Sequence, residues 1–360
     1  MIIDSILLEA GKYNVSDVHL SVGRPPMMRL NGELVSMETF EVLEPSDMED
    51  ITMEILTEEQ KETLFTQGDV DFVYTIEEGR RYRFNAYMER ENYALAIRLL
   101  STSIPTMEQL NLPPALYDMA DKPRGLVLIT GPTGSGKSTT LASMIDHINT
   151  VRRSHIITLE DPIEYIHYHK NSIIHQREVG ADTTDYQRAL RGALRQDPDV
   201  ILLGEMRDYE TMQAAITAAE TGHLVFSTVH TKGAANTIDR IIDSFPADQQ
   251  QQVRIQLASV LEGVVTQNLV KKADNSGRAL VMEILVMTDA VRSMIRDAKT
   301  YQILSTLQTG IALGMQSMDY HLAQLVKQGV IDQEEALSQA MKQEDVMLSL
   351  IHISEPTRPY

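Results

Sequence analysis

The segment GPTGSGKS at residues 131–138 constrains the fold of this 360-residue chain more than any other feature. An apolar run, GLVLIT (125–130), comes directly before it, and a stretch of helical character (137–150) begins inside it. The segment fits the pattern G-x-x-x-x-G-K-[ST], in which glycines let the backbone curl and point its N–H groups at phosphate groups. The sequence therefore predicts a strand, a phosphate-binding loop and a helix in immediate succession.

Two side chains of this segment have tasks that an ordinary glycine-rich turn would not require. The Lys137 ammonium brings positive charge to the phosphates, and the Ser138 hydroxyl is in the position of a Mg²⁺ ligand. We therefore expect ATP and Mg²⁺ as ligands. The predicted nucleotide-binding residues of the segment are Gly131, Pro132, Thr133, Gly134, Ser135, Gly136, Lys137, Ser138 and Thr139.

The chain around this segment alternates short apolar runs with helical stretches. Each apolar run is too short for a typical core helix, and the alternation favours an α/β fold with a parallel sheet covered by helices on both faces. Strands are predicted over 125–131, 155–161, 199–205 and 223–230, and helices over 137–150, 184–196 and 208–221. Beyond Ala247 we expect mostly helix, with one hairpin near 275–277.

Residues 1–100 have a different pattern, which predicts a separate and smaller α/β unit. An amphipathic opening helix precedes alternating runs that are typical of antiparallel strands. These strands are predicted over 18–23, 27–35, 70–76 and 80–100, with Asn31-Gly32 as a hairpin turn and an acidic helix over about 45–65. The prolines within 101–123 indicate a linker, and the larger domain is expected over 124–348.

Composition narrows the possible functions. Asp and Glu number 51 against 32 Lys and Arg, which gives a net charge of −19 and argues against a nucleic-acid partner. The absence of cysteine from the sequence excludes disulfides and thiolate metal sites. The N-terminus lacks the features of a secretory signal, and no apolar run approaches the length of a membrane span. A cytoplasmic protein is expected.

Two of the predicted strands end in carboxylates. Glu160 closes one strand, and Glu205 follows Gly204 at the end of another. Because open parallel sheets bind ligands at the carboxyl ends of their strands, these side chains are placed to orient water or hold magnesium. Gly204 stands where related motifs have a metal-binding aspartate, so Glu205 is either the general base or a substitute metal ligand. We keep Glu160 and Glu205 as catalytic candidates, and Ser138 with Glu205 as metal ligands.

Neighbouring residues have structural as well as functional interpretations. Asp161 followed by Pro162 is typical of the capped start of a helix, although a carboxylate there can also serve the site. His223 and His230 bracket the apolar run LVFSTV and are either core histidines or groups near the nucleotide. Of these two, His230 is retained as a nucleotide-binding candidate.

Taken together, the motifs of this sequence resemble those of a known family. In their order and spacing, GPTGSGKSTT, ITLEDPIEYIH, ILLGEMRD and HLVFSTVHT resemble the Walker A loop, Asp box, atypical Walker B motif and His box of the secretion ATPase superfamily. Within it the chain is most similar to the retraction motors of type IV pili, the PilT group, from about Ser16 to about Ala340. AVRSMIRD (290–297) resembles the C-terminal signature of those motors.

The resemblance implies a PAS-like N-terminal domain, a RecA-like C-terminal domain and a homohexamer with ATP between domains. It also implies that Arg83 and Arg98 bring charge to the transferring phosphoryl group, with surface charge as the alternative. The implied partner is the inner-membrane platform protein of the pilus. Such a motor works at the inner face of the cytoplasmic membrane and associates with it only through the pilus machine.

The motifs leave competing functions open. The motors of pilus extension and type II secretion are longer and usually carry a four-cysteine zinc module, which disfavours them. A nucleic-acid translocase on a RecA core is disfavoured by the negative charge. A nucleotide-binding regulatory scaffold that does not hydrolyse ATP is separated from the motor only by a measurement of ATPase activity.

AVRSMIRD predicts an amphipathic helix. Its period puts Val291, Met294 and Ile295 on one face, which is expected to pack on the C-terminal helices. Arg292 and Arg296, four residues apart, share another face and are expected to be free for a partner.

The end of the sequence departs from the family pattern. Residues 349–360, SLIHISEPTRPY, contain two prolines that end any helix. We interpret them as a non-native segment or a disordered tail and assign them no function.

Overall fold

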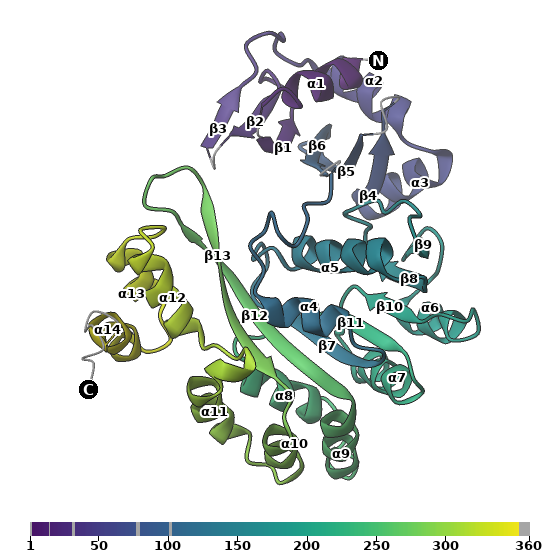
Figure 1. Ribbon diagram of the computed structural model, residues 1–360. Coiled ribbons are helices and arrows are strands. Elements are labelled where there is room, and N and C mark those ends of the chain that lie inside the picture. Colours follow the sequence, from purple (N-terminus) through teal and green to yellow (C-terminus); the bar gives the residue numbers. More distant parts are fainter. Residues whose placement is uncertain (1, 14, 31–32, 77–79, 101–102, 353–360) are drawn as a thin grey trace. The chain divides into compact units, whose positions relative to one another are not determined.

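The chain is described by a computed structural model (Figure 1), which covers all residues except 1, 14, 31–32, 77–79, 101–102 and 353–360. The residues form two compact units, Met1–Ser103 and Ile104–Tyr360. The residues predicted as a linker, 101–123, instead belong to the second unit from Ile104 on. The reason is apolar burial, since Met107 and Leu116 are part of a core of that unit.

The first unit is a six-stranded sheet with helices packed on one face. Its elements are α1 (Ile2–Ala10), β1 (Val15–Leu20), β2 (Met27–Leu30), β3 (Glu33–Ser36), α2 (Pro45–Ile55), α3 (Glu58–Gln67), β4 (Asp69–Thr75), β5 (Arg81–Glu89) and β6 (Asn92–Leu99). The strands pair in the order β3-β2-β1-β6-β5-β4, antiparallel throughout. Alternate residues of β5 such as Tyr82 and Phe84 are buried with Ile3 and Met48 of the helices, which is the period expected of a half-covered strand.

The acidic helix predicted over 45–65 is two helices, α2 and α3. Thr57 separates them because its hydroxyl accepts a hydrogen bond from the Gln60 N–H while the Gln60 side chain accepts one from the Thr57 N–H. This reciprocal cap starts a new helix. The predicted Asn31-Gly32 turn lies outside the described residues, and Leu30 and Glu33 on either side of it pair in register.

The second unit contains a seven-stranded sheet in the order β13-β12-β7-β11-β10-β8-β9. Its elements up to the sheet's last strand are α4 (Pro114–Ala120), β7 (Gly125–Thr130), α5 (Lys137–Val151), β8 (His155–Glu160), β9 (Ile173–Glu178), α6 (Tyr186–Ala193), β10 (Val200–Leu203), α7 (Tyr209–Glu220), β11 (Leu224–Val229), α8 (Ala234–Asp243), α9 (Gln250–Val260), β12 (Leu261–Lys271) and β13 (Arg278–Val286). The helices that follow are α10 (Asp289–Arg296), α11 (Ile303–Thr309), α12 (Met318–Lys327), α13 (Gln333–Gln339) and α14 (Gln343–His352), with short 3₁₀ turns η1 (Thr300–Gln302) and η2 (Ile311–Leu313).

The strands predicted around the phosphate segment are confirmed as β7, β8, β10 and β11, which pair in parallel. The hairpin predicted near 275–277 is confirmed as antiparallel β12 and β13. The sequence does not predict that β12 lies parallel to β7 in the same sheet. The edge strand β9 was not predicted either, because its sequence IIHQRE is largely polar and has no buried-strand pattern.

Helices cover both faces of this sheet (Figure 1). α4 and α5 pack on one face through residues such as Leu116 and Ile145. α6 to α10 pack on the other face through residues such as Leu190, Ile216 and Leu257. Because β7, β8, β10 and β11 are parallel, their carboxyl ends meet at one edge of the sheet, called here the carboxyl edge; their amino ends form the amino edge.

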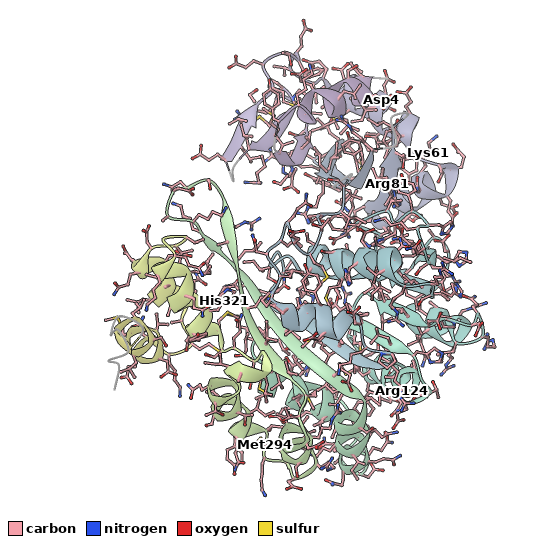
Figure 2. The ribbon with its side chains drawn as sticks, viewed as in Figure 1. Asp4, Lys61, Arg81, Arg124, Met294 and His321 are labelled. Carbon is pink, nitrogen blue, oxygen red and sulfur yellow. The ribbon has the colours of Figure 1, made fainter. Side chains whose placement is uncertain are left out.

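The C-terminal helices α12 to α14 form a small core of their own with the β12–β13 hairpin. His321 of α12 (Figure 2) joins the two, since its Nδ1 accepts a hydrogen bond of 2.9 Å from the Met282 N–H of β13. The tail predicted over 349–360 begins inside α14, which continues to His352; the remainder lies outside the described residues. Among the residues that the structure covers, none of the helices combines the length and the apolar character needed to cross a membrane.

Candidate active site

The phosphate-binding segment has the backbone that its glycines predict. It links β7 to α5, and Gly131, Gly134 and Gly136 have φ angles of 135°, 77° and 85°, which are strained for residues with a side chain. At Gly131 a Cβ would also lie 2.2 Å from the carbonyl oxygen of Gln267. Gly136 gives α5 no side-chain cap, so the N–H groups of its first turn are available to an anion.

Lys137 folds back over the loop. Its Nζ donates hydrogen bonds to the carbonyl oxygens of Gly131 at 2.9 Å and Pro132 at 3.0 Å. Burial lowers the pKa of Lys137, while the negative charges of Glu205 and Glu164 oppose that shift. Phosphate oxygens would offer this buried cation a stronger, charged partner than carbonyl oxygens do.

Gln267 of β12 supports the loop and was not predicted. Its Nε2 donates a hydrogen bond of 2.8 Å to the carbonyl oxygen of Ser135, and the side chain is fully buried. Beside it, the hydroxyls of Thr130 and Thr266 are 2.8 Å apart and join the end of β7 to β12. A signal was present in the sequence, because a polar Thr-Gln pair interrupts the apolar run VVTQNLV.

Glu160 ends β8 among neutral hydrogen-bond donors. Its Oε1 accepts from Thr158 Oγ1 at 2.6 Å and from Gln176 Nε2 at 3.1 Å. Burial raises the pKa of Glu160 to about 7 in spite of these two hydrogen bonds, and the charges of Glu164 and Glu178 act in the same direction. A carboxyl group with a pKa near 7 is suited to act as a general base.

Glu205, just beyond β10, is held by charged or chargeable partners instead. Its Oε2 accepts from Arg207 Nε at 2.9 Å, and its Oε1 lies 3.2 Å from His230 Nε2. Two residues predicted for the site, Glu205 and His230, are therefore in contact, because β10 and β11 are neighbours. His223 lies at the other end of β11, where its Nδ1 bonds the carbonyl oxygen of Ala218.

The helix-capping role considered for Asp161 is wrong. Within the described residues no helix begins at Pro162, and the chain runs from β8 to β9 as an irregular segment. This segment is held from the β9 side, since the Ile163 N–H donates a 3.0 Å hydrogen bond to Glu178 Oε2. Asp161 stays exposed at the carboxyl edge.

A nucleotide with Mg²⁺ fits these residues. Among the described residues, no group of three Asp, Glu or His side chains gathers to hold a metal alone. Mg²⁺ does not need one, because it usually takes one or two protein oxygens together with waters and phosphate oxygens. Ser138 and Glu205 can supply such oxygens. In the same part of the structure, Ser135 Oγ and Gln267 Oε1 are buried without a hydrogen-bond partner, so the loop has polar atoms that a ligand can satisfy.

Arg83 and Arg98 lie in the first unit, directly opposite each other on β5 and β6. Arg83 Nε is 3.9 Å from Asp71 Oδ1, and Arg98 Nε is 2.9 Å from Asp17 Oδ1. Both side chains stay well exposed, at 41% and 63%, and exposed ion pairs contribute little to stability. The two guanidinium groups therefore share one accessible face, opposite the buried face that packs on the helices.

The arginines of AVRSMIRD differ from each other, contrary to expectation. The segment forms α10, and its buried Val291 and Ile295 confirm the predicted apolar face. That face packs mainly with the α9 side of the larger core rather than with α12 to α14. Arg296 is exposed, but Arg292 is not free.

Arg292 fastens α10 to the end of α9. Its Nη1 donates to the carbonyl oxygen of Ala258 at 2.7 Å, and its Nη2 donates to Glu262 Oε1 at 2.9 Å. The other oxygen of Glu262 is 3.1 Å from Lys122 Nζ, just before β7. Spacing along a helix could not reveal these partners, because they come from distant parts of the chain.

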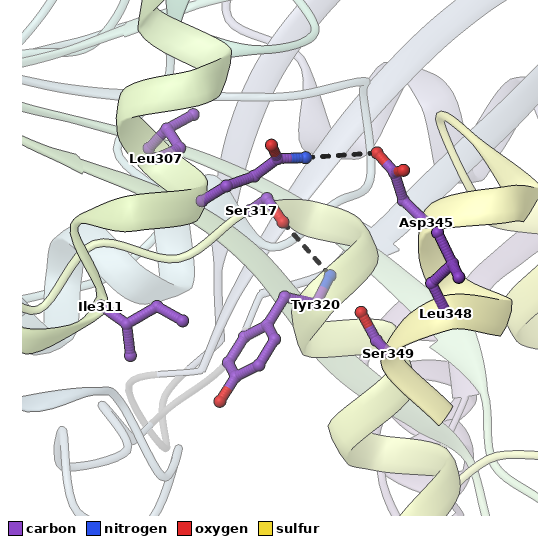
Figure 3. Close-up of a pocket in the computed structure, with 8 residues that line it drawn as sticks. Leu307, Ile311, Ser317, Tyr320, Asp345, Leu348 and Ser349 are labelled. Atoms are coloured by element: carbon purple, nitrogen blue, oxygen red, sulfur yellow. Dashed lines mark hydrogen bonds between the residues drawn. The ribbon is translucent and has the colours of Figure 1, made fainter. Parts of the chain in front are cut away.

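A hollow of about 230 Å³ lies among the C-terminal helices, and its lining residues are far from the nucleotide motifs in the sequence. Leu307, Tyr320 and Leu348 line it together with Asp345, which accepts a hydrogen bond from Gln308 (Figure 3). None of its lining residues belongs to a nucleotide motif, so we do not include it in the site.

Comparison with known proteins matches residues 88–338 to the family of type II/IV secretion system proteins. This chain belongs to that family. A type IV pilus retraction ATPase of Pseudomonas aeruginosa, PilT, is 44% identical over 340 residues, which cover 94% of this chain and 98% of PilT. A twitching motility protein of Neisseria gonorrhoeae is 45% identical over 321 residues, 89% of this chain and 86% of that protein.

The match to a solved structure of this family extends over both units of the chain. The crystal structure of the pilus retraction motor PilT with bound ADP is 44% identical and has a TM-score of 0.89, covering 95% of this chain and 98% of that one. The expected fold, an N-terminal domain built on a β-sheet and a C-terminal α/β ATPase domain, is thereby confirmed.

Proposed function

We propose that this chain is an ATP-hydrolysing motor subunit that drives the retraction of type IV pili, and with it twitching motility. The observation that carries the proposal is the phosphate loop with its buried Lys137, at the same sheet edge as Glu160 and Glu205. The 44% identity to a retraction ATPase over 94% of the chain supports the same function.

The residues of the site divide the chemistry of hydrolysis among them. The loop N–H groups and Lys137 bind and orient the phosphates. Glu160, with its pKa near 7, takes a proton from the attacking water, and Glu205 helps to orient that water or holds the metal. Bound Mg²⁺ would neutralise charge on the β- and γ-phosphates. Ser138 and Glu205 are the residues that would hold it.

Arg83 and Arg98 are proposed to stabilise negative charge that develops on the transferring phosphoryl group. Their exposed, adjacent guanidinium groups support this role. Arg83→Ala and Arg98→Ala should each lower kcat more than nucleotide affinity, because the charge matters most in the transition state. A raised KM with unchanged kcat would limit the arginines to ground-state binding.

The assembled motor is proposed to be a homohexamer. It would act at the inner face of the cytoplasmic membrane on the platform protein of the pilus. The similarity to pilus motors supports this arrangement. Electron microscopy of the purified chain with and without ATP tests both the ring and its motion.

Retraction in cells is the deciding experiment. The chain is expressed in a piliated, type IV pilus-bearing strain that lacks its own retraction motor, and twitching is measured beside the ATPase rate of the purified protein. We expect hydrolysis together with restored twitching, and neither with Lys137→Ala. Hydrolysis without twitching would point to pilus extension or secretion instead. Nucleotide binding without hydrolysis would point to the regulatory scaffold.

A further inference from the structure

Gly204 stands at the end of β10, where many phosphate-loop enzymes have a metal-binding aspartate. Another residue fills the place of the side chain that Gly204 lacks. A Cβ built on Gly204 would lie 2.8 Å from the hydroxyl oxygen of Tyr186, which is nearer than the carbonyl oxygen of Leu159 at 3.2 Å or the Cα of Glu160 at 3.5 Å. The Tyr186 hydroxyl therefore occupies the space in which a side chain at position 204 would begin.

The start of α6 directs Tyr186 to this place. Tyr186 is the first residue of α6, and Asp185 caps the helix by accepting a 2.7 Å hydrogen bond from the Arg188 N–H. Ala189 and Leu190, one turn on, are buried in the core beneath the sheet, and the ring of Tyr186 packs against the same core. The tyrosine is thus anchored at both its backbone and its ring.

The surroundings of the hydroxyl are mostly acidic. Burial raises the pKa of Tyr186, and the negative charges of Asp161, Glu205 and Glu160 raise it further against the opposing charge of Arg207. The phenol therefore keeps its proton at any pH at which the enzyme works. A tyrosine hydroxyl in this state is a permanent hydrogen-bond donor beside groups that can only accept when ionised.

We propose that Tyr186 is a positioning residue for ATP hydrolysis: its hydroxyl replaces the absent side chain at position 204 and donates a hydrogen bond that orients the reacting water beside the Glu160 and Glu205 carboxylates. This rests on the proposed function. A phenylalanine ring would fill the same volume without offering a donor, so the proposal concerns the hydroxyl alone.

The test compares Tyr186→Phe with a matched control, Tyr209→Phe. Tyr209 is also the first residue of a helix, α7, after an aspartate cap, and its ring packs edge-on against Phe245 with centroids 6.0 Å apart. We expect Tyr186→Phe to lower kcat roughly tenfold, the scale of one hydrogen bond to the reacting water lost in the transition state. KM, the affinity for a fluorescent ADP analogue and the melting temperature should stay unchanged. Tyr209→Phe should change none of these.

A second variant tests the shared space directly. Gly204→Ala introduces a Cβ where the hydroxyl lies, so it should displace the hydroxyl and lower kcat by itself. In the Tyr186→Phe variant the hydroxyl is absent, so adding Gly204→Ala should lower kcat little further. The two effects would therefore be strongly non-additive, as expected of groups in contact.

Each result decides the matter. Wild-type kcat in Tyr186→Phe, a change in KM alone, or effects of the two substitutions that simply multiply would overturn the proposal. A fall in melting temperature that parallels the loss of activity would make Tyr186 a structural residue and overturn it as well. If the wild-type chain and Tyr209→Phe both lack ATPase activity, the failure lies with the proposed function. The affinity for the fluorescent ADP analogue then still shows whether the site binds nucleotide.

Discussion

The two edges of the seven-stranded sheet carry charges in opposite arrangements. At the carboxyl edge, Lys137 bonds only neutral carbonyl oxygens in the contacts described, and Glu160 accepts only from a hydroxyl and an amide. At the amino edge, Glu262 lies between Lys122 and Arg292, so each oxygen of its carboxylate has a cationic partner. Buried charge is thus compensated at one edge and left to a ligand at the other.

This difference distinguishes groups that do chemistry from groups that hold the fold. A charge that lacks a charged partner is costly unless a ligand supplies one, which is why perturbed pKa values gather at functional sites. Glu205 is intermediate, because it has partners in Arg207 and His230 yet lies beside the loop. Substitutions at the carboxyl edge should therefore change activity, and those at the amino edge should change stability.

The largest effect is expected at Lys137. Lys137→Ala should reduce hydrolysis to background because phosphate loses its buried counter-charge. The melting temperature should change little, since in the ligand-free chain the ammonium is bonded only to loop carbonyls. Phosphate release and thermal melting measure the two quantities. Turnover at the wild-type rate would contradict the assignment of the loop.

The two glutamates come next. Glu160→Gln and Glu205→Gln keep volume and remove charge, so each should slow hydrolysis about 10²-fold while nucleotide still binds. Single-turnover kinetics beside binding of a fluorescent nucleotide separate the two steps. A glutamate whose variant hydrolyses ATP normally belongs with the structural charges of the amino edge.

At the amino edge, Arg292→Ala should act on stability. It leaves Glu262 with Lys122 as its only cationic partner among the described residues and removes the donor to the Ala258 carbonyl oxygen at the end of α9, so we expect the free energy of unfolding to fall by about 1–3 kcal/mol. Arg296→Ala, on the exposed face of the same helix, is the matched control and should stay within about 0.5 kcal/mol.

The same pair separates stability from motor output. Because Arg292 is structural, loss of twitching in Arg292→Ala would be ambiguous, whereas Arg296→Ala tests coupling cleanly. We expect Arg296→Ala to keep ATPase activity and lose retraction. Normal twitching would make Arg296 an ordinary surface charge.

The smallest effect is the pH dependence from Glu160. Since a base must be deprotonated, the rate should rise with pH through about 7, with roughly a twofold gain between pH 7 and pH 8. The free energy of unfolding should change in the opposite direction. Glu160 binds its proton more tightly in the folded chain than in the unfolded chain, where the carboxyl has a pKa near 4.5. Stability should therefore fall as the pH rises from 4.5 to 7. Glu160→Gln should remove both dependences, and an unchanged rate profile would exclude Glu160 as the base.

Local patterns predicted much of the second unit. The loop of residues 131–138 needs glycines at given backbone angles, and a lysine and serine at given places, so a short segment specifies its own conformation. The parallel strands were predictable because strands buried on both faces are continuously apolar. The edge strand β9 was not predictable in this way, because it is polar and lacks the apolar pattern. The break before Thr57 was not predictable either, because it depends on a side-chain cap.

What the sequence by itself determined is therefore the phosphate loop, the positions of the main strands along the chain and the acidic residues at their carboxyl ends. Only the tertiary structure decided which partner each charged group has. Gln267 reaches the loop from β12, Tyr186 reaches Gly204 from α6, and Arg292 reaches Glu262 across α9. The physical reason is that backbone conformation is a local property, whereas the environment of a charge is set by whatever the fold packs around it.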